Sequence, residues 1–320
     1  MECYNCRNND LKREYSFHEF QLYTCRQCNL SKIYPSPSQD VLSKYYSGTE
    51  NNIAKGNTEN EILAFKSNPL QVIKILFKTR FAPLTGIKEV DEVFKNKNES
   101  VIMDVGCGGG VFLASLSYLD HKNLYGIEYN KESVELIKKH FKYNITRSEI
   151  KVQEHYPKAD IVTCFDVIEH LTEPAGAAKE LNRMLKDGRY LHIRVPNYGS
   201  LVSRILRSKW LWTIPPFHLN YFTKQSLENI FSMNGFEVLK LYTSSSGYRL
   251  AFITLQVKKI FRNDVNIATP HSRSFSDFEF FLINIAEVIF KIIYSPVILF
   301  QKIFDMDDCI TLVAKKTKAV

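Results

Sequence analysis

Four cysteines near the N-terminus have the spacing of a metal site. Cys3 and Cys6 form one pair and Cys25 and Cys28 form a second, with two residues inside each pair. Each pair can close a tight knuckle, and four thiolates complete the tetrahedral ligand set that Zn²⁺ prefers. A site closed by four protein ligands has no position left for a substrate. We therefore predict a zinc ion with a structural role.

A glycine-rich segment is the second candidate for chemistry. Residues 104–110 read DVGCGGG and lie between an apolar segment and a helix-like segment. Glycines let the backbone turn sharply and let a ligand approach without a Cβ in the way, and a helix N-terminus offers free N–H groups beside them. The positions that we expect to contact a bound cofactor here are Asp104, Gly106, Cys107, Gly108 and Gly110.

An acidic residue follows the next apolar segment and completes this pattern. Glu128 ends the segment 124–128, where a carboxylate can accept hydrogen bonds from both hydroxyls of a ribose. A dinucleotide fingerprint would need glycine at position 111, which is Val111, and no Gly-Lys-Ser/Thr follows to make a P-loop. The pattern predicts a ligand that contains adenosine.

Histidines supply the candidates for proton transfer. His218 lies in the segment 215–221, PPFHLNY, where two prolines stiffen the chain, and histidine titrates near neutral pH. We consider His218 the first candidate for a general base, with structural hydrogen bonding in its loop as the alternative. His170 is either a structural or ligand-lining residue or a base, and Tyr221 either orients a substrate hydroxyl or belongs to the core.

Alternating elements are expected to position these residues. Apolar strand-like and amphipathic helix-like segments follow one another from residue 100 to residue 242, and a last strand-like segment covers residues 309–315. This alternation favours an α/β fold with a doubly wound, mostly parallel sheet. The remaining cysteines, Cys107, Cys164 and Cys309, fall in or beside apolar segments and are expected to be buried.

Composition divides the chain into three regions. We predict a zinc-ribbon module in residues 1–35, a linker and helical segment in residues 36–95, and the large domain in residues 96–320. An apolar helical insertion is expected at about 250–306, because so long a loop without secondary structure is uncommon. This insertion, with its apolar core at 277–304, could pack on the domain, line a tunnel, form a dimer or lie on a membrane.

Charge and apolar content exclude few functions. The formal net charge of +8 allows an anionic partner such as nucleic acid or lipid, although lysines that only solvate the surface explain it equally well. The first residues contain no apolar stretch typical of a secretory signal, and paired cysteines favour a reducing compartment. We expect a cytoplasmic protein, with peripheral contact at the inner membrane face as an added hypothesis.

These motifs together resemble the class I S-adenosylmethionine-dependent methyltransferases. Residues 104–110 and Glu128 are similar to the first two motifs of that family, and residues 164–171, CFDVIEHL, resemble the strand-four motif of its ubiquinone-biosynthesis-like branch. Residues 180–197 and 215–238 resemble later segments of the same group. The resemblance covers about 101–242 and the last strand, and it implies a Rossmann-like sheet of seven strands.

The resemblance also implies roles for particular residues. The backbone of residues 106–110 would hold the methionine end of S-adenosylmethionine, Asp104 would order the loop, and Glu128 would bind the ribose. Phe165 and Asp166 would lie beside the cofactor. The segment before Asp160 lacks the acid and small-residue pair that often meets adenine, so the adenine contact stays unassigned.

The acceptor is the least determined part. The segment 215–221 and the N-terminal cysteines resemble sugar C-methyltransferases that carry a zinc module, which favours a small molecule or glycan, such as a nucleotide-linked or lipid-linked sugar of polysaccharide synthesis. A ribosomal RNA methyltransferase is the alternative, although the N/D-P-P-Y/F motif of amino-methylating nucleic-acid enzymes is absent. A non-catalytic cofactor-binding module is the third reading.

Overall fold

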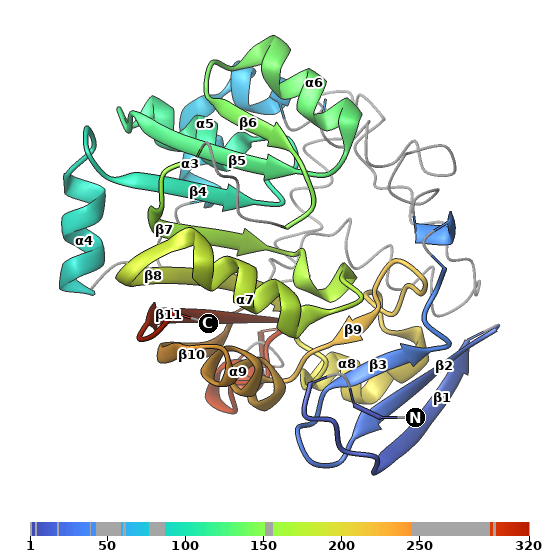
Figure 1. Ribbon diagram of the computed structural model, residues 1–320. Helices are drawn as coiled ribbons and strands as arrows, with labels where there is room; N and C mark the ends of the chain where they lie inside the picture. Colours follow the sequence, from blue (N-terminus) through green and yellow to red (C-terminus); the bar gives the residue numbers. More distant parts are fainter. Residues whose placement is uncertain are drawn as a thin grey trace.

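The computed structural model contains one large mixed sheet and one small antiparallel sheet (Figure 1). Residues 43–58 of the predicted linker and helical segment, and most of the insertion predicted at about 250–306, lie outside the described residues. Within the described residues, no helix has the length and apolar character needed to cross a membrane. The residues that the structure describes are 2–3, 5–17, 19–38, 40–42, 59, 62–76, 87–150, 156–244, 295–296 and 299–319.

The large sheet has seven strands in the order β10-β11-β8-β7-β4-β5-β6. The pairs among β4 to β8 that neighbour each other are parallel, whereas β11 is antiparallel to both β8 and β10. This confirms the predicted doubly wound fold with seven strands. The bounds are β4 Val101–Val105, β5 Asn123–Glu128, β6 Asn144–Arg147, β7 Ala159–Phe165, β8 Leu185–Pro196, β10 Phe236–Ser244 and β11 Cys309–Lys316.

Helices cover both faces of this sheet, which explains its apolar central strands. Every residue of β4 and of β7 is buried, as expected for parallel strands with helices on both sides. Figure 1 shows α5 and α6 near β4 to β6, α7 near β7 and β8, and α9 near β10 and β11. The helices are α3 Pro69–Leu76, α4 Lys88–Lys95, α5 Val111–Tyr118, α6 Lys131–His140, α7 Pro174–Met184, α8 Leu201–Leu206 and α9 Lys224–Met233.

Local signals set the starts of several helices. Helix α7 begins with Pro174 in its first turn, where the missing N–H has no cost. Helix α9 begins with a capping box in which Thr223 and Ser226 bond reciprocally. The Asn130 side chain caps α6 by accepting from the Ser133 N–H at 2.8 Å.

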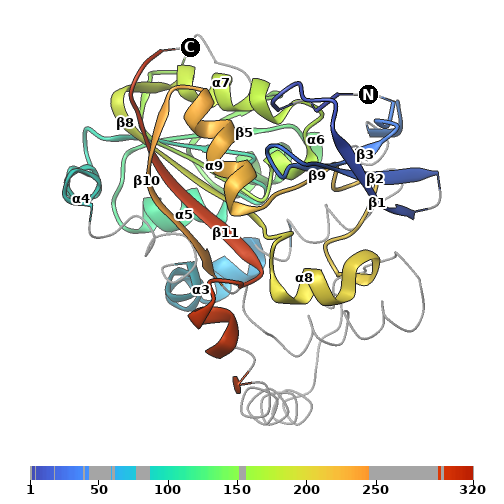
Figure 2. The ribbon, with the colours of Figure 1, turned by 90° about the horizontal axis from the view of Figure 1, so that it is seen from below.

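The small sheet has a fourth strand from a distant part of the chain. Strands β1 Leu11–Phe17, β2 Phe20–Cys25 and β3 Ser31–Tyr34 form an antiparallel meander, and β9 Asn220–Tyr221 pairs with β3. Figures 1 and 2 both place β9 beside β3. The sheet of the N-terminal module, meaning residues 2–34, is therefore completed by a segment that follows β8 along the chain.

A shared apolar cluster packs the module against the large domain. Leu22 and Ile33 of the module are fully buried together with Leu219 and Trp210, and Tyr221 is almost as well covered. Burial of apolar area of this kind stabilises by about 25 cal/mol per Å². The module is therefore fixed by side-chain packing as well as by strand pairing.

Candidate functional site

The strand order reverses between β4 and β7, which defines the place where a ligand should bind. From β4 the chain moves outward through β5 to β6, and then it returns to β7 on the other side of β4. In open α/β sheets, ligands bind at the carboxyl ends of the strands on either side of such a switch point. The glycine loop follows β4 there, and Asp166 follows β7.

The glycine loop has an open backbone at its centre. Gly106 has φ +72°, and a Cβ on it would lie 2.3 Å from Cγ2 of Val167. Only glycine fits that position without strain. Gly108 has φ +53°, and a Cβ on it would meet no described atom within 4 Å. The loop is thus packed tightly at one end and leaves room for a ligand at Gly108.

Glu128 fastens this loop to the end of β5. Its two carboxylate oxygens accept from the Gly108 N–H and the Asn130 N–H, both at 2.8 Å. Burial of the carboxyl raises the pKa of Glu128, and these hydrogen bonds oppose that shift. Each carboxylate oxygen has a second lone pair, so Glu128 can hold the loop and still accept from ribose hydroxyls. These residues therefore fit an adenosine-type cofactor.

Two further hydrogen bonds, from Thr163 and from Tyr143, support the loop. The buried Asp104 accepts from the Thr163 hydroxyl at 2.6 Å, which ties β4 to β7. The Tyr143 hydroxyl donates to the Gly110 carbonyl oxygen at 2.6 Å. Cys107 is buried, as predicted, and burial raises the pKa of its thiol. The sequence did not indicate the part that Tyr143 has in this loop, because its partner lies 33 residues away.

The two residues expected beside the cofactor after β7 have different surroundings. The Phe165 ring makes edge contacts with Phe112 and His192 inside the core. Asp166 has φ +57° and forms an ion pair with Arg194 of β8. Of the two, Asp166 is therefore the more exposed, and it directly follows β7 at the switch point.

An acid and two histidines lie close together near the carboxyl end of β7. Glu169 and His170 belong to the 3₁₀ helix η2 Ile168–His170, and His218 comes from the segment before β9. One donor atom from each of the three side chains lies within 4.8 Å of the other two. The sequence identified both histidines as candidates, and the structure brings them together. The sequence did not identify Glu169 as a candidate, although its position next to His170 could have suggested a paired acid and base.

Burial sets the protonation of this cluster. Desolvation raises the pKa of Glu169 well above its ordinary value, with the nearby Asp166 acting in the same direction. Neither carboxylate oxygen of Glu169 has a hydrogen-bond partner among the described residues. Burial lowers the pKa of His170. Burial therefore favours the protonated form of the Glu169 carboxyl and the neutral form of the His170 imidazole.

Hydrogen bonding fixes the tautomer of His170. Its Nδ1 lies 2.8 Å from the Phe217 carbonyl oxygen, which can only accept, so Nδ1 carries the hydrogen. In the neutral ring, Nε2 is then an acceptor, and it lies 3.8 Å from Oε1 of Glu169. A ring oriented in this way can take a proton or ligate a metal.

Aromatic rings surround His218 on several sides. Its ring is stacked on Trp212 and on Phe217, with centroids 6.0 and 5.6 Å apart, and it meets the edge of His170 at 4.7 Å. Tyr221 lies 6.4 Å away, and burial raises the pKa of its phenol, so Tyr221 stays neutral. The three predicted catalytic residues, His170, His218 and Tyr221, thus share one aromatic environment.

The four N-terminal cysteines converge as predicted. Sγ of Cys3 lies 3.5 Å from Sγ of Cys28, Sγ of Cys6 lies 3.5 Å from Sγ of Cys25, and all four lie within 4.8 Å of one another. A tetrahedral ion with bonds of about 2.3 Å separates its sulfur ligands by about 3.8 Å. The hydrogen bond from Cys28 lowers the pKa of Cys3 to about 5. This cluster fits a zinc ion.

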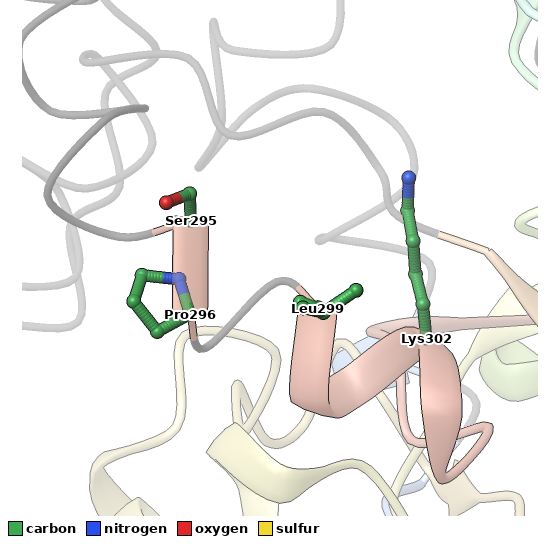
Figure 3. Close-up of a pocket in the computed structure, with 4 residues that line it drawn as sticks. All are labelled: Ser295, Pro296, Leu299 and Lys302. Carbon is green, nitrogen blue, oxygen red and sulfur yellow. The ribbon is translucent and has the colours of Figure 1, made fainter.

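A separate pocket of about 480 Å³ lies in the chain segment before β11 (Figure 3). Its lining residues are Ser295, Pro296, Leu299 and Lys302. These side chains offer one hydroxyl and one ammonium group, and they include no member of the glycine loop or of the acid-histidine cluster. The chemistry therefore points to the switch point as the functional site.

Comparison with known proteins supports the same reading. A family model described as a methyltransferase domain matches residues 79–241, about half of the chain. The ubiquinone biosynthesis O-methyltransferase of Hydrogenovibrio crunogenus is 26% identical over 38% of this chain and 54% of its own length. The protein of that name from Colwellia psychrerythraea is 31% identical over 36% of this chain and 50% of its own. The chain thus spans about half the length of these curated relatives.

A solved structure resembles the chain more broadly but at lower identity. The crystal structure of an S-adenosylmethionine-dependent methyltransferase from Archaeoglobus fulgidus is 20% identical, with a TM-score of 0.43. It covers 76% of this chain and 98% of its own.

Proposed function

Since this chain belongs to the methyltransferase domain family and is a class I S-adenosylmethionine-dependent methyltransferase by sequence and fold, we propose that it transfers a methyl group to a small-molecule acceptor. The observation that carries the proposal is the open backbone at Gly108 beside Glu128. A carboxylate with remaining lone pairs suits a ribose, and an uncovered loop backbone suits the amino-acid end of the donor.

The bound sulfonium would supply an already activated methyl group. The protein then needs mainly to align acceptor, methyl carbon and sulfur, which is a positional effect. In this proposal the loop 106–110 and Glu128 hold the donor, and Asp104 supports the loop. Asp166, paired with Arg194, follows β7 at the switch point. The bond from the methyl carbon to the acceptor forms as its bond to sulfur breaks.

We assign proton transfer to the acid-histidine cluster. For a hydroxyl acceptor, the oxygen forms the new bond to carbon and its proton passes to the imidazole of His218. His170 is the second candidate, because its Nε2 is an acceptor in the neutral ring. Tyr221, a neutral phenol, would orient an acceptor hydroxyl. Burial of this cluster keeps water away from the reacting atoms.

Calorimetric titration with S-adenosylmethionine and, separately, NAD tests the proposal. Micromolar binding of the methyl donor corresponds to about 8 kcal/mol, and Glu128→Ala should weaken it strongly. Glu135→Ala is the matched control, because Glu135 is exposed on α6, where it forms an ion pair with Lys131. Binding of NAD, or no binding of the donor, would contradict the proposal.

For the cysteine cluster we propose a structural Zn²⁺ held by Cys3, Cys6, Cys25 and Cys28. A module of this size cannot bury enough apolar area to fold without help. Metal analysis should find one zinc per chain. Substitution by Co²⁺ should give the visible absorption of a tetrahedral thiolate site, and a chain purified without bound metal that keeps its module folded would refute the role.

For the acceptor we propose a sugar, nucleotide-linked or lipid-linked. The support is the likeness of the zinc module and of residues 215–221 to sugar methyltransferases, whereas the names of the curated relatives point to a hydroxyl acceptor in ubiquinone synthesis. A turnover screen with nucleotide sugars and phenols as two arms separates these classes. For contact with a membrane, co-sedimentation with anionic vesicles at low salt is the test, and absence of binding would exclude it.

A further inference from the structure

The segment that carries His218 is bonded along one side to η2. The His170 ring donates to the Phe217 carbonyl at 2.8 Å, and the Leu219 N–H donates to the Glu169 carbonyl at 2.9 Å. The Asn220 side chain donates to the Leu171 carbonyl at 2.6 Å. These three contacts, from residues on both sides of His218, thus hold it in register with the acid-histidine pair.

The other side of the same segment is bonded to the N-terminal module. The Ile33 N–H donates to the Leu219 carbonyl at 3.1 Å, and Ser31 and Lys32 pair with Tyr221 and Asn220. Leu219 is therefore bonded on both sides, through its N–H to η2 and through its carbonyl to β3. Its neighbour His218 has little freedom to move independently of the module.

Lys32 of β3 also bonds directly to the chain just after η2. Its ammonium donates to the Thr172 carbonyl at 2.6 Å, just after η2, and only 4% of the residue is exposed. Lysine is almost never fully buried, because removing its charge from water is costly. By contrast, the side chain of Lys12 on β1 is 56% exposed. The buried lysine links the module directly to the loop behind the acid-histidine pair.

The cysteine cluster lies at the start of β3. The Cys25 N–H donates to the Leu30 carbonyl and the Asn29 N–H donates to the Cys25 carbonyl, both at 2.9 Å, which closes the turn from Cys25 to Leu30. Strand β3 begins at Ser31, three residues after Cys28. The direction of β3 is therefore set by the same turn that supplies two of the four thiolates.

We propose that the N-terminal module is a positioning element of the acceptor side, with Lys32 as its main positioning residue: strand β3 and the Lys32 ammonium hold the segment 217–221 against η2, so that His218 faces Glu169 and His170. This inference rests on the proposed function for its meaning in catalysis. The donor loop 106–110 shares none of these contacts, so donor binding does not depend on them.

The test compares Lys32→Met with Lys32→Arg, and with Lys12→Met as the control. Nitrogen-15 NMR of the histidine rings follows the titration of His170 and His218, assigned with His170→Gln and His218→Gln. We expect Lys32→Met to move at least one midpoint by about half a pH unit or more. Lys32→Arg should keep the midpoints close to their wild-type values, and Lys12→Met should not move them. Calorimetry should find the affinity for S-adenosylmethionine within about twofold in all three.

Asn220→Leu provides a second perturbation if Lys32→Met does not fold, because it removes the bond to Leu171 at the register position opposite Lys32. It should move the same ring signals. Unchanged ring titration in these variants would overturn the inference, as would loss of donor binding together with the ring changes, since the module would then support the whole domain. A wild-type chain that fails to bind the donor would refute the proposed function, whereas the ring titrations would still test the positioning.

Discussion

The proposed donor side and the proposed acceptor side of this molecule lie at the same end of the sheet and are built in different ways. The donor side comes from β4, the glycine loop and the end of β5, all within residues 101–128. The acceptor side is assembled from residues 31–33 of the module, residues 169–172 after β7, and residues 217–221 before α9. A local motif makes the first, and contacts between distant segments make the second.

This difference implies that the two sides can be damaged separately. The donor loop is stabilised by bonds within the large domain, from Glu128, Tyr143 and Thr163, so it should survive loss of the module. The acceptor side depends more on distant segments, because apart from local contacts to Ile214 and Trp212, residues 217–221 are bonded to the module, to η2 and to Leu171. The following variants test that separation, beginning with the largest expected effect.

Cys28→Ser should produce the largest change, confined to the acceptor side. Structural zinc supplies about 10–16 kcal/mol in small zinc peptides, so we expect the module to lose zinc and most of its protection from hydrogen exchange in β1 to β3. The affinity for S-adenosylmethionine should stay within about threefold. Hydrogen exchange and calorimetry measure the two sides, with Ser16→Ala as a control on β1. Equal loss of protection in β4 and β5 would contradict the separation.

Gly106→Ala should damage the donor side alone. A Cβ there would lie 2.3 Å from Val167, and a left-handed backbone costs a residue with a Cβ about 1–2 kcal/mol. Together with the steric strain, donor affinity should fall about 100-fold. Gly176→Ala is the matched control, because its added Cβ meets Glu173 at an ordinary 3.6 Å inside α7. Calorimetry checks both, and a Gly106 variant with wild-type affinity would show that the loop is not the donor site.

Glu169→Gln should change the pH dependence of stability through the acceptor side. The folded-state pKa of Glu169 is raised above 4.5 by burial and by Asp166, and Arg194 opposes this shift. The native state therefore holds a proton that the unfolded state has released, and the free energy of unfolding falls as pH rises from 4.5 through the folded pKa. The amide cannot ionise, so this fall should be smaller in the variant.

Urea unfolding of wild type and Glu169→Gln across that pH range measures the effect. We also expect methyl transfer to fall by about 100-fold, whereas donor affinity should not change. Parallel pH profiles of stability in the two proteins would mean that Glu169 does not release its proton in this range.

Tyr143→Phe should have the smallest effect, on the donor side. It removes the hydrogen bond to the Gly110 carbonyl, which contributes about 1 kcal/mol. Donor affinity should fall by about fivefold or less. Tyr118→Phe is the control, since Tyr118 is exposed on α5. A loss as large as that of Gly106→Ala would show that the hydroxyl contacts the donor directly.

The sequence predicted the donor side far better than the acceptor side. The loop 104–110 and Glu128 could be found because glycines, a strand and an acid follow one another within a short distance. His170 and His218 were chosen by residue type, but their proximity and the part played by Glu169 depend on a fold that brings residues 48 apart together. The pairing of β3 with β9 leaves no trace in local periodicity, since β9 has two residues.

The completion of the small sheet by β9 has a consequence for synthesis of the chain. Residues 31–34 leave the ribosome early, but their partner strand, residues 220–221, follows almost 190 residues later. At about 5–20 residues per second this delay is roughly 10–40 s. During that time the outer edge of β3 has exposed N–H and carbonyl groups and an uncovered Ile33, a surface that invites pairing with other chains. The unpaired edge of β3 would therefore be a place for a chaperone to bind before β9 is made.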